Sequence, residues 1–257
     1  SYYRWPITYD GRPLRAYQSG RSIVAAGYRG RGIFTRLLLA GEEAAHAEQS
    51  ADLFIGFPVA ASYGALIKVG WTSPLSLQWF VRPLVRLPGR RHATEGPATE
   101  TTDLTSPTLK REFAVSDSPE FAAWRRSIAG YDATPRIDVE STAGPAGRAL
   151  LRRRERGPVG EWTIGSIRTV GDDAAAYRAL LRQCIDAVLH ADRRAAFLSI
   201  ALNTELKQRG LLTALRRSAF VPTHKRILFT VKNGPVSHLP IGDPGRWRMF
   251  RADIDTW

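Results

Sequence analysis

The chain has 257 residues, of which 44 % are hydrophobic and 24 % are charged, a composition typical of globular rather than disordered proteins. Its formal net charge of +13 attracts polyanions such as nucleic acids, phosphorylated cofactors and acidic carrier proteins. No apolar run approaches the roughly 20 residues of a membrane-spanning helix, and the single cysteine, Cys184, excludes a disulfide framework, so we expect a soluble, cytoplasmic protein that binds neither membrane nor metal.

The first half of the chain alternates strand and helix patterns. A tight hairpin is expected at Asp10-Gly11, because Asp-Gly tolerates the positive φ angles that such a turn needs. Apolar residues recur at near-helical spacing after Gly32 and predict an amphipathic helix. The predicted elements are strands at Trp5–Tyr9, Leu14–Gln18 and Ser22–Ala26, a helix at Ile33–Gln49, a strand at Leu53–Phe57, a helix at Ala60–Val69 and a strand at Gln78–Val85.

A polar stretch at Leu87–Pro107, rich in Pro, Gly and Thr, predicts a linker, after which the pattern begins again. The predicted elements are a helix at Pro119–Ile128, strands at Arg136–Ser141, Arg148–Arg154 and Trp162–Val170, a helix at Asp173–Leu189, a strand at Ala196–Ala201, a helix at Thr204–Ser218, and strands near Phe220 and at Ile227–Val231. Both halves therefore read strand, long helix, strand, helix, strand. This repetition indicates an internal duplication whose second copy has Arg168–Asp172 in place of the glycine-rich turn.

The segment Tyr28–Ile33, with the sequence Tyr-Arg-Gly-Arg-Gly-Ile, has the features of a diphosphate cradle at the start of a helix. Backbone N–H groups can point at a bound diphosphate only where no side chain intervenes, and Gly30 and Gly32 meet that need. Arg29 and Arg31 can add charge-assisted hydrogen bonds, and Thr35 can add a hydroxyl. A loop with solvated arginines is the alternative interpretation of this segment.

The residues Val24–Trp71 resemble the core of the GNAT acyltransferase superfamily, whose cradle reads Arg or Gln, two residues, Gly, one residue, then Gly or Ala. Arg29 and Gly32 match this pattern and Phe34 departs from it. The resemblance covers the first third of the chain and implies an α/β (α+β) fold of two GNAT-like domains, each a mixed sheet flanked by helices. The expected boundaries are 1–88 for the acyl-CoA-binding domain, 89–112 for the linker and 113–257 for a degenerate copy.

The resemblance also implies where an acyl donor binds. The strand at Ile23, Val24 and Ala25 would hydrogen-bond the pantetheine arm of acetyl-CoA or another acyl-CoA, with the thioester carbonyl near the Val24 N–H. The phosphates would lie at Arg29, Gly30, Arg31, Gly32, Ile33, Phe34 and Thr35. The cofactor would enter the gap between that strand and Phe54–Phe57.

The usual catalytic groups of the family are missing from this sequence. Many relatives place a tyrosine acid four residues before a Gly-Phe pair, which is Gly70-Trp71 here, and an asparagine eleven residues before it; Leu66 and Val59 occupy these positions. Tyr63, one helical turn earlier, is the candidate acid, and a tyrosine that packs at a helix start is the alternative interpretation. The acceptor is expected to be an amine of a small metabolite, aminosugar or biosynthetic intermediate.

The acceptor site is expected to need further residues. GNAT domains open with a strand and two helices before the hairpin, whereas Ser1 lies almost at the hairpin, so the N-terminal copy is expected to lack these elements. Either an N-terminal segment is absent from the given sequence, or the second half of the chain and a partner subunit in a homodimer complete the site.

Two other functional classes stay open at the level of sequence. Fem-type transferases also pair two GNAT folds but take an aminoacyl group from tRNA, and the net charge and the cluster Arg152–Arg156 fit a tRNA or an acyl carrier protein as donor. A protein that only binds acyl-CoA is the other alternative. A tRNA donor should lose affinity steeply as salt rises, whereas coenzyme A should lose it mildly.

Overall fold

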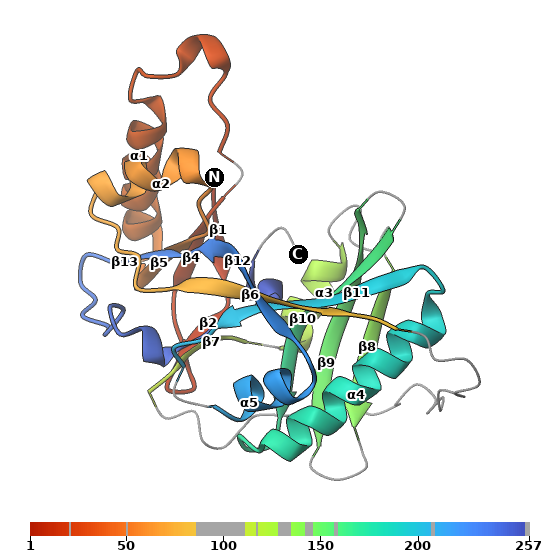
Figure 1. Cartoon of the computed structure of the whole chain (residues 1–257). Coiled ribbons are helices and arrows are strands. Elements are labelled where there is room, and N and C mark those ends of the chain that lie inside the picture. Colours follow the sequence, from red (N-terminus) through yellow and green to blue (C-terminus); the bar gives the residue numbers. More distant parts are fainter. Residues whose placement is uncertain are drawn as a thin grey trace. The chain divides into compact units, whose positions relative to one another are not determined.

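The computed structural model describes residues 1–20, 22–49, 51–85, 111–116, 118–127, 135–141, 146–156, 159–206 and 209–254 (Figure 1). The chain forms two compact units. Unit 1 comprises Ser1–Leu77, Lys110–Asp117 and Arg226–Met249, and unit 2 comprises Gln78–Leu109, Ser118–Lys225 and Phe250–Trp257. The expected domains 1–88 and 113–257 follow the order of the chain and stay a prediction, whereas each compact unit takes segments from both halves. Apart from residues 111 and 112, the expected linker lies outside the described residues.

Unit 1 is built on a four-stranded sheet in the order β1 (Tyr2–Trp5), β4 (Ala16–Ser19), β5 (Leu53–Gly56) and β13 (Thr230–Asn233). β4 and β5 run parallel, and the two outer strands are antiparallel to their neighbours. Helices α1 (Ile33–Gln49) and α2 (Ala60–Lys68) accompany this sheet, and one buried cluster joins side chains of both helices to those of the strands. It comprises Tyr17, Leu38, Ala45, Ala51, Phe54, Leu66 and Trp71. A Cβ on Gly41 would lie 2.5 Å from the Tyr2 ring, so α1 needs glycine there.

A second, smaller sheet of unit 1 has the order β14 (Trp247–Arg248), β7 (Phe113–Val115), β2 (Ile7–Tyr9) and β3 (Arg12–Pro13). The single strand expected at Trp5–Tyr9 is therefore two strands, β1 and β2, which belong to different sheets. Pro6 separates them, because proline has no N–H to offer to a ladder. The expected turn is confirmed, since Asp10 and Gly11 have φ angles of 51° and 75°.

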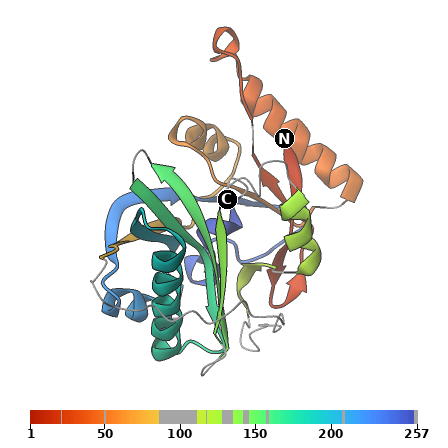
Figure 2. The same ribbon diagram turned by 90° about the vertical axis from the view of Figure 1, so that its right-hand side faces the viewer.

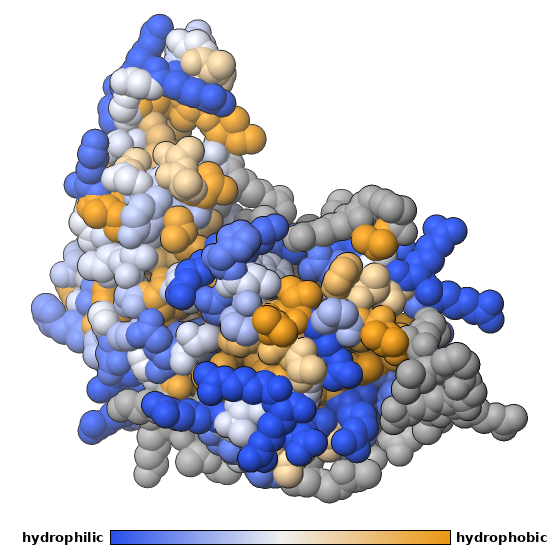
Figure 3. All heavy atoms as spheres, in the orientation of Figure 1, coloured by the Kyte–Doolittle hydropathy of each residue, from blue (hydrophilic) through white to orange (hydrophobic). Residues whose placement is uncertain are grey.

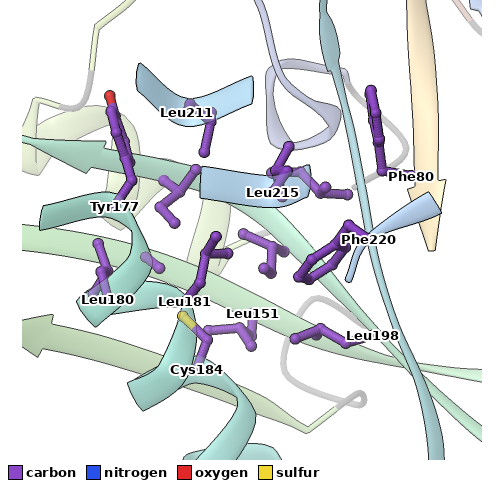
Figure 4. Packing of buried hydrophobic residues seen from close by; sticks show 14 of the residues in the cluster. Phe80, Leu151, Tyr177, Leu180, Leu181, Cys184, Leu198, Leu211, Leu215 and Phe220 are labelled. Atoms are coloured by element: carbon purple, nitrogen blue, oxygen red, sulfur yellow. The ribbon is translucent and has the colours of Figure 1, made fainter. Parts of the chain in front are cut away.

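A six-stranded sheet forms the centre of unit 2, with the order β12 (Val221–Leu228), β6 (Ser76–Pro83), β11 (Ala195–Asn203), β10 (Val159–Thr169), β9 (Gly147–Arg156) and β8 (Arg136–Ser141). Helices α4 (Ala174–Ala191) and α5 (Gly210–Arg217) pack on it (Figure 2). Figure 4 shows this core, in which Leu180 and Leu181 of α4 and Leu215 of α5 meet Leu151 and Leu198 of the sheet. Cys184 is a buried member of the same core, and its burial raises the pKa of the thiol.

The remaining helical segments are short. Helix α3 (Pro119–Ser127) belongs to unit 2, as does the 3-10 helix η3 (Arg251–Asp253). The 3-10 helices η1 (Ala26–Tyr28) and η2 (Pro244–Arg246) belong to unit 1. Among the described residues, no helix is both long enough and apolar enough to cross a membrane.

The expected repetition in the order of elements is confirmed, since β4, α1, β5, α2 and β6 are followed by β10, α4, β11, α5 and β12, which we call the first and second copy, while their origin by duplication stays a prediction. In both copies the first two strands pair in parallel. The helix expected at Thr204–Ser218 begins later, at Gly210, where the Asp172 carboxylate accepts the backbone N–H at 3.0 Å. The chain thus has a mixed α/β fold, with mixed sheets flanked by helices.

Candidate functional site

The cradle predicted at Tyr28–Ile33 has the backbone conformation that its glycines suggest. Gly30 and Gly32 have φ angles of 78° and 68°, a region that residues with a side chain rarely adopt. A Cβ built on either residue would meet no atom within 4 Å. Glycine is therefore required here by the backbone and not by crowding, and the space beside the turn is open.

Helix α1 begins directly after this turn. The Arg36 N–H donates to the Gly32 carbonyl at 3.0 Å, which closes the first helical turn. The N–H groups of Ile33, Phe34 and Thr35 lie in that turn, where helix geometry gives them no intrahelical partner. The first turn holds no acidic residue, so the positive end of the helix dipole is not neutralised there. The arrangement is suited to an anion.

Both arginines of the cradle are exposed, and each makes a contact with another residue of the same loop. Arg29 Nε donates to the Val24 carbonyl at 3.2 Å, and the Arg31 guanidinium lies 5.3 Å from the centre of the Tyr28 ring. Figure 3 shows hydrophilic and apolar side chains mixed on the surface where Figure 1 draws α1 and α2. The cradle thus presents two cations to solvent beside open backbone.

The strand predicted at Ser22–Ala26 is wrong. Ile23, Val24 and Ala25 form no strand, Ile23 is 89 % exposed, and the chain turns into η1 at Ala26. An apolar run suggested the strand, but no neighbouring strand pairs with it. The strand before the cradle is β4, whose last residue Ser19 pairs with Gly56 of β5. The parallel pairing of β4 with β5 thus ends at Ser19 and Gly56, and a donor arm that extends the sheet would meet β4 there.

The candidate acid Tyr63 lies in the first turn of α2, after β5, and is half-buried. Its backbone N–H donates to the Val59 carbonyl at 3.1 Å. Val59 is 70 % exposed, whereas Leu66 is buried against the cluster that contains Trp71. Leu66 is therefore a core residue, and a role for Tyr63 stays a prediction.

The helix start of the second copy is occupied by its own side chains. Asp173 accepts hydrogen bonds from the N–H groups of Ala175 and Ala176, at 3.1 and 2.9 Å, and caps α4. Asp172 precedes it and accepts from Gly210. Two carboxylates at this position oppose a diphosphate, because like charges repel and the donors are already used.

The gap between the parallel strands of the second copy is also filled. β10 and β11 pair as far as Ile164 and Ile200 and then part, and Leu202 forms an antiparallel bridge with Phe250. The segment from Phe250 to Ile254 is buried and includes η3, which contacts both strands. Asp253 Oδ2 accepts from the Phe250 N–H at 2.6 Å and stabilises the turn. The position that a donor arm would take in this copy is thus held by the chain itself.

Two arginines of the basic cluster in the second half contact other side chains of unit 2. In the cluster Arg152–Arg156, Arg153 Nε donates to Asp192 at 2.8 Å and Arg154 lies 6.0 Å from the centre of the Trp79 ring. The cluster Arg152–Arg156 is therefore a weaker sign of nucleic-acid binding than the sequence suggests.

Within the described ranges, no group of three or more His, Cys, Asp or Glu side chains is placed to hold a metal ion.

Comparison with known proteins identifies the fold. No protein-family model and no curated protein sequence matches the chain. A GCN5-related N-acetyltransferase from Anabaena variabilis matches with a TM-score of 0.56 at 11 % identity, over 92 % of this chain and 59 % of that protein. The N-myristoyltransferase of Saccharomyces cerevisiae, solved with bound myristoyl-CoA, matches with a TM-score of 0.58 at 10 % identity, over 92 % and 67 %.

A tandem GNAT protein from the clavulanic acid biosynthesis pathway matches with a TM-score of 0.54 at 13 % identity, over 89 % of this chain and 81 % of that protein. This match therefore extends over both halves of the chain. The chain spans less than two thirds of the Anabaena protein. The identities are low, so the likeness is one of fold, and the chain has the fold of the GNAT N-acetyltransferases.

Proposed function

We propose that the protein is an N-acyltransferase whose first copy takes an acetyl or other short acyl group from coenzyme A and transfers it to an amine of a small molecule. The observation that carries this proposal is the open cradle at Gly30 and Gly32, which precedes a first turn of α1 without acidic residues. A diphosphate at this point would accept hydrogen bonds from the backbone N–H groups of the first turn and would bind the side chains of Arg29 and Arg31. The GNAT fold and the position of the cradle after the end of the β4–β5 pairing at Ser19 and Gly56 support the same site.

The proposed reaction needs few catalytic side chains. A thioester reacts with a neutral amine when the two are held in place, and a backbone N–H stabilises the oxyanion that forms. The departing thiolate needs a proton, and Tyr63 is the candidate to donate it. A small-molecule acceptor, with residues of the second half or of a partner subunit around it, completes the proposal.

A donor such as aminoacyl-tRNA or an acyl carrier protein is the second candidate, and acyl-CoA binding without catalysis is the third. The net charge of +13 favours a large polyanion. Against tRNA, Arg153 is paired with Asp192 and contributes less free charge to the surface. The cradle favours coenzyme A, because a tRNA donor has no use for a diphosphate site.

The proposal predicts that Gly32→Glu abolishes binding of acetyl-CoA. The substitution places a bulky anion where the diphosphate would lie and forces a side chain onto a φ of 68°. Isothermal titration calorimetry should show at least about a hundredfold loss of affinity, which corresponds to about 2.7 kcal/mol. Circular dichroism should show that the variant is folded.

Gly171→Glu is the matched control. Gly171 has a φ of 80° with no atom within 4 Å of a built Cβ, and it precedes the first helix of the second copy. The strain of the substitution is therefore similar, but acetyl-CoA affinity should stay as in the unsubstituted protein. Normal binding by a folded Gly32→Glu variant would refute the proposed site.

A further inference from the structure

Gln18, the next-to-last residue of strand β4, has a side-chain amide that finds no hydrogen-bond partner in the fold. It is 0 % exposed, and neither Nε2 nor Oε1 has a hydrogen-bond partner in the described part of the chain. Its strand neighbours are Tyr3 of β1 and Ile55 of β5. Ile55 and the Val231 that pairs with it are fully buried and apolar, so these two side chains can give the amide no hydrogen bond.

A buried amide without a hydrogen-bond partner lowers the stability of the folded state. A buried donor or acceptor that has lost water without gaining a partner costs about 1 to 3 kcal/mol, and native structures avoid it unless the group serves a purpose. Gln78 on β6 shows the ordinary arrangement. It is buried to 7 % exposure, and its Nε2 donates to the carbonyls of Trp79 and Thr223.

The place of Gln18 suggests what satisfies it. It is one residue before Ser19, where the pairing of β4 with β5 ends, and strand alternation turns its side chain away from Tyr17, which packs in the cluster beneath α1 and α2. A ligand that extends the sheet beyond Ser19 would pass the amide. Since Nε2 donates and Oε1 accepts, one partner that offers a C=O and an N–H together, an amide, would satisfy both atoms.

We propose that Gln18 is a donor-binding residue that pairs with an amide of the pantetheine arm of coenzyme A. The inference rests on the proposed function, since it assigns a further contact within that site. The diphosphate would bind at the cradle and the arm at Gln18, so the two contacts belong to different parts of one ligand. Because Gln18 is enclosed without ligand, binding would displace the groups that cover it.

The test compares coenzyme A with 3′-phospho-ADP, the same nucleotide without the arm. Gln18→Met keeps the length of the side chain and removes both polar atoms. Calorimetry should show about a tenfold or greater loss of affinity for coenzyme A, with affinity for 3′-phospho-ADP unchanged. Equal affinity of the variant and the unsubstituted protein for coenzyme A would overturn the inference.

A second measurement separates binding from structure. Without ligand, Gln18→Met should leave the melting temperature unchanged or raise it, because the substitution removes an unsatisfied group. Gln78→Met, the control, should lower the melting temperature, because it breaks hydrogen bonds, and leave coenzyme A affinity unchanged. A melting temperature that falls as far in Gln18→Met as in Gln78→Met would indicate a structural amide and contradict the inference.

The failure of the proposed function looks different. If the unsubstituted protein binds neither coenzyme A nor 3′-phospho-ADP, the donor site itself is wrong and the role of Gln18 falls with it. If both ligands bind the unsubstituted protein and Gln18→Met alike, the donor site stands and only the role of Gln18 is wrong.

Discussion

Glu42 of α1 is a buried carboxylate that joins separate segments of unit 1. Its Oε1 accepts from Trp71 Nε1 at 2.7 Å, and its Oε2 accepts from Lys232 Nζ at 2.6 Å. Lys232 also donates to the Val69 carbonyl at 2.9 Å, at the end of α2. The carboxylate therefore connects the helix that carries the cradle to α2 and to the late strand β13.

Removing the cation of the Glu42–Lys232 pair should destabilise the protein, because the carboxylate stays buried. Lys232→Met leaves Glu42 buried without its cation, and we expect the free energy of unfolding to fall by about 2 to 4 kcal/mol, as for other buried pairs. Urea denaturation measures this loss. The double variant Glu42→Gln with Lys232→Met should lose less than the sum of the two single variants.

Arg15 and Asp52 supply the control for this prediction. They form a bidentate pair in which the Arg15 side chain is half exposed, so Arg15→Met should change stability little. Similar losses in Arg15→Met and Lys232→Met would show that burial does not set the strength of the Glu42 pair.

The sequence alone predicts the conformation of residues that depend only on their neighbours in the chain. Positive φ angles at Asp10, Gly11, Gly30 and Gly32 follow from residue type and from the turns that these residues make. Gln18 could not be singled out in this way, because an amide is recognised as unsatisfied only when all its neighbours are placed. Tyr63 lies between these cases, since its helix is predictable and its chemistry is not.

At the scale of elements, periodicity predicted the helices and most strands but not their partners. β13 pairs with β5, although about 170 residues separate them in the chain, and β6 of the first half lies beside β11 of the second. Such pairing depends on tertiary packing and leaves no local pattern. The same limit explains the error at Ser22–Ala26, where an apolar run met no strand to pair with.

The segment Phe250–Ile254 should behave as an integral part of unit 2. Phe250 is 3 % exposed and belongs to the core of that unit, so Phe250→Ala should cost about 3 to 5 kcal/mol. Val236→Ala is the control, because that side chain is 66 % exposed and its loss should change little. Urea denaturation compares the two, and equal midpoints would mean that the segment does not fill the gap.

At the scale of the whole molecule, each compact unit holds an aspartate with a lowered pKa. Partial burial raises the pKa of Asp52 in unit 1, but the side-chain and backbone hydrogen bonds from Arg15 outweigh it, so the net pKa lies below its usual value. Asp192 in unit 2 shows the same balance. Burial raises its pKa, and the bonds from Trp162 and Arg153 lower it further than burial raises it.

These shifts predict how acid unfolds the protein. A carboxylate whose folded pKa is depressed adds stability above the unfolded value of about 3.9 and loses it as the pH falls through the folded pKa. The urea midpoint should therefore hold between about pH 5 and 7 and fall below about pH 4. Asp192→Asn should lower the midpoint at neutral pH and flatten this fall, whereas Asp138→Asn, with a side chain 51 % exposed, should follow the unsubstituted protein. If the Asp192→Asn curve ran parallel to that of the unsubstituted protein below pH 4, Asp192 would not be a source of the acid sensitivity.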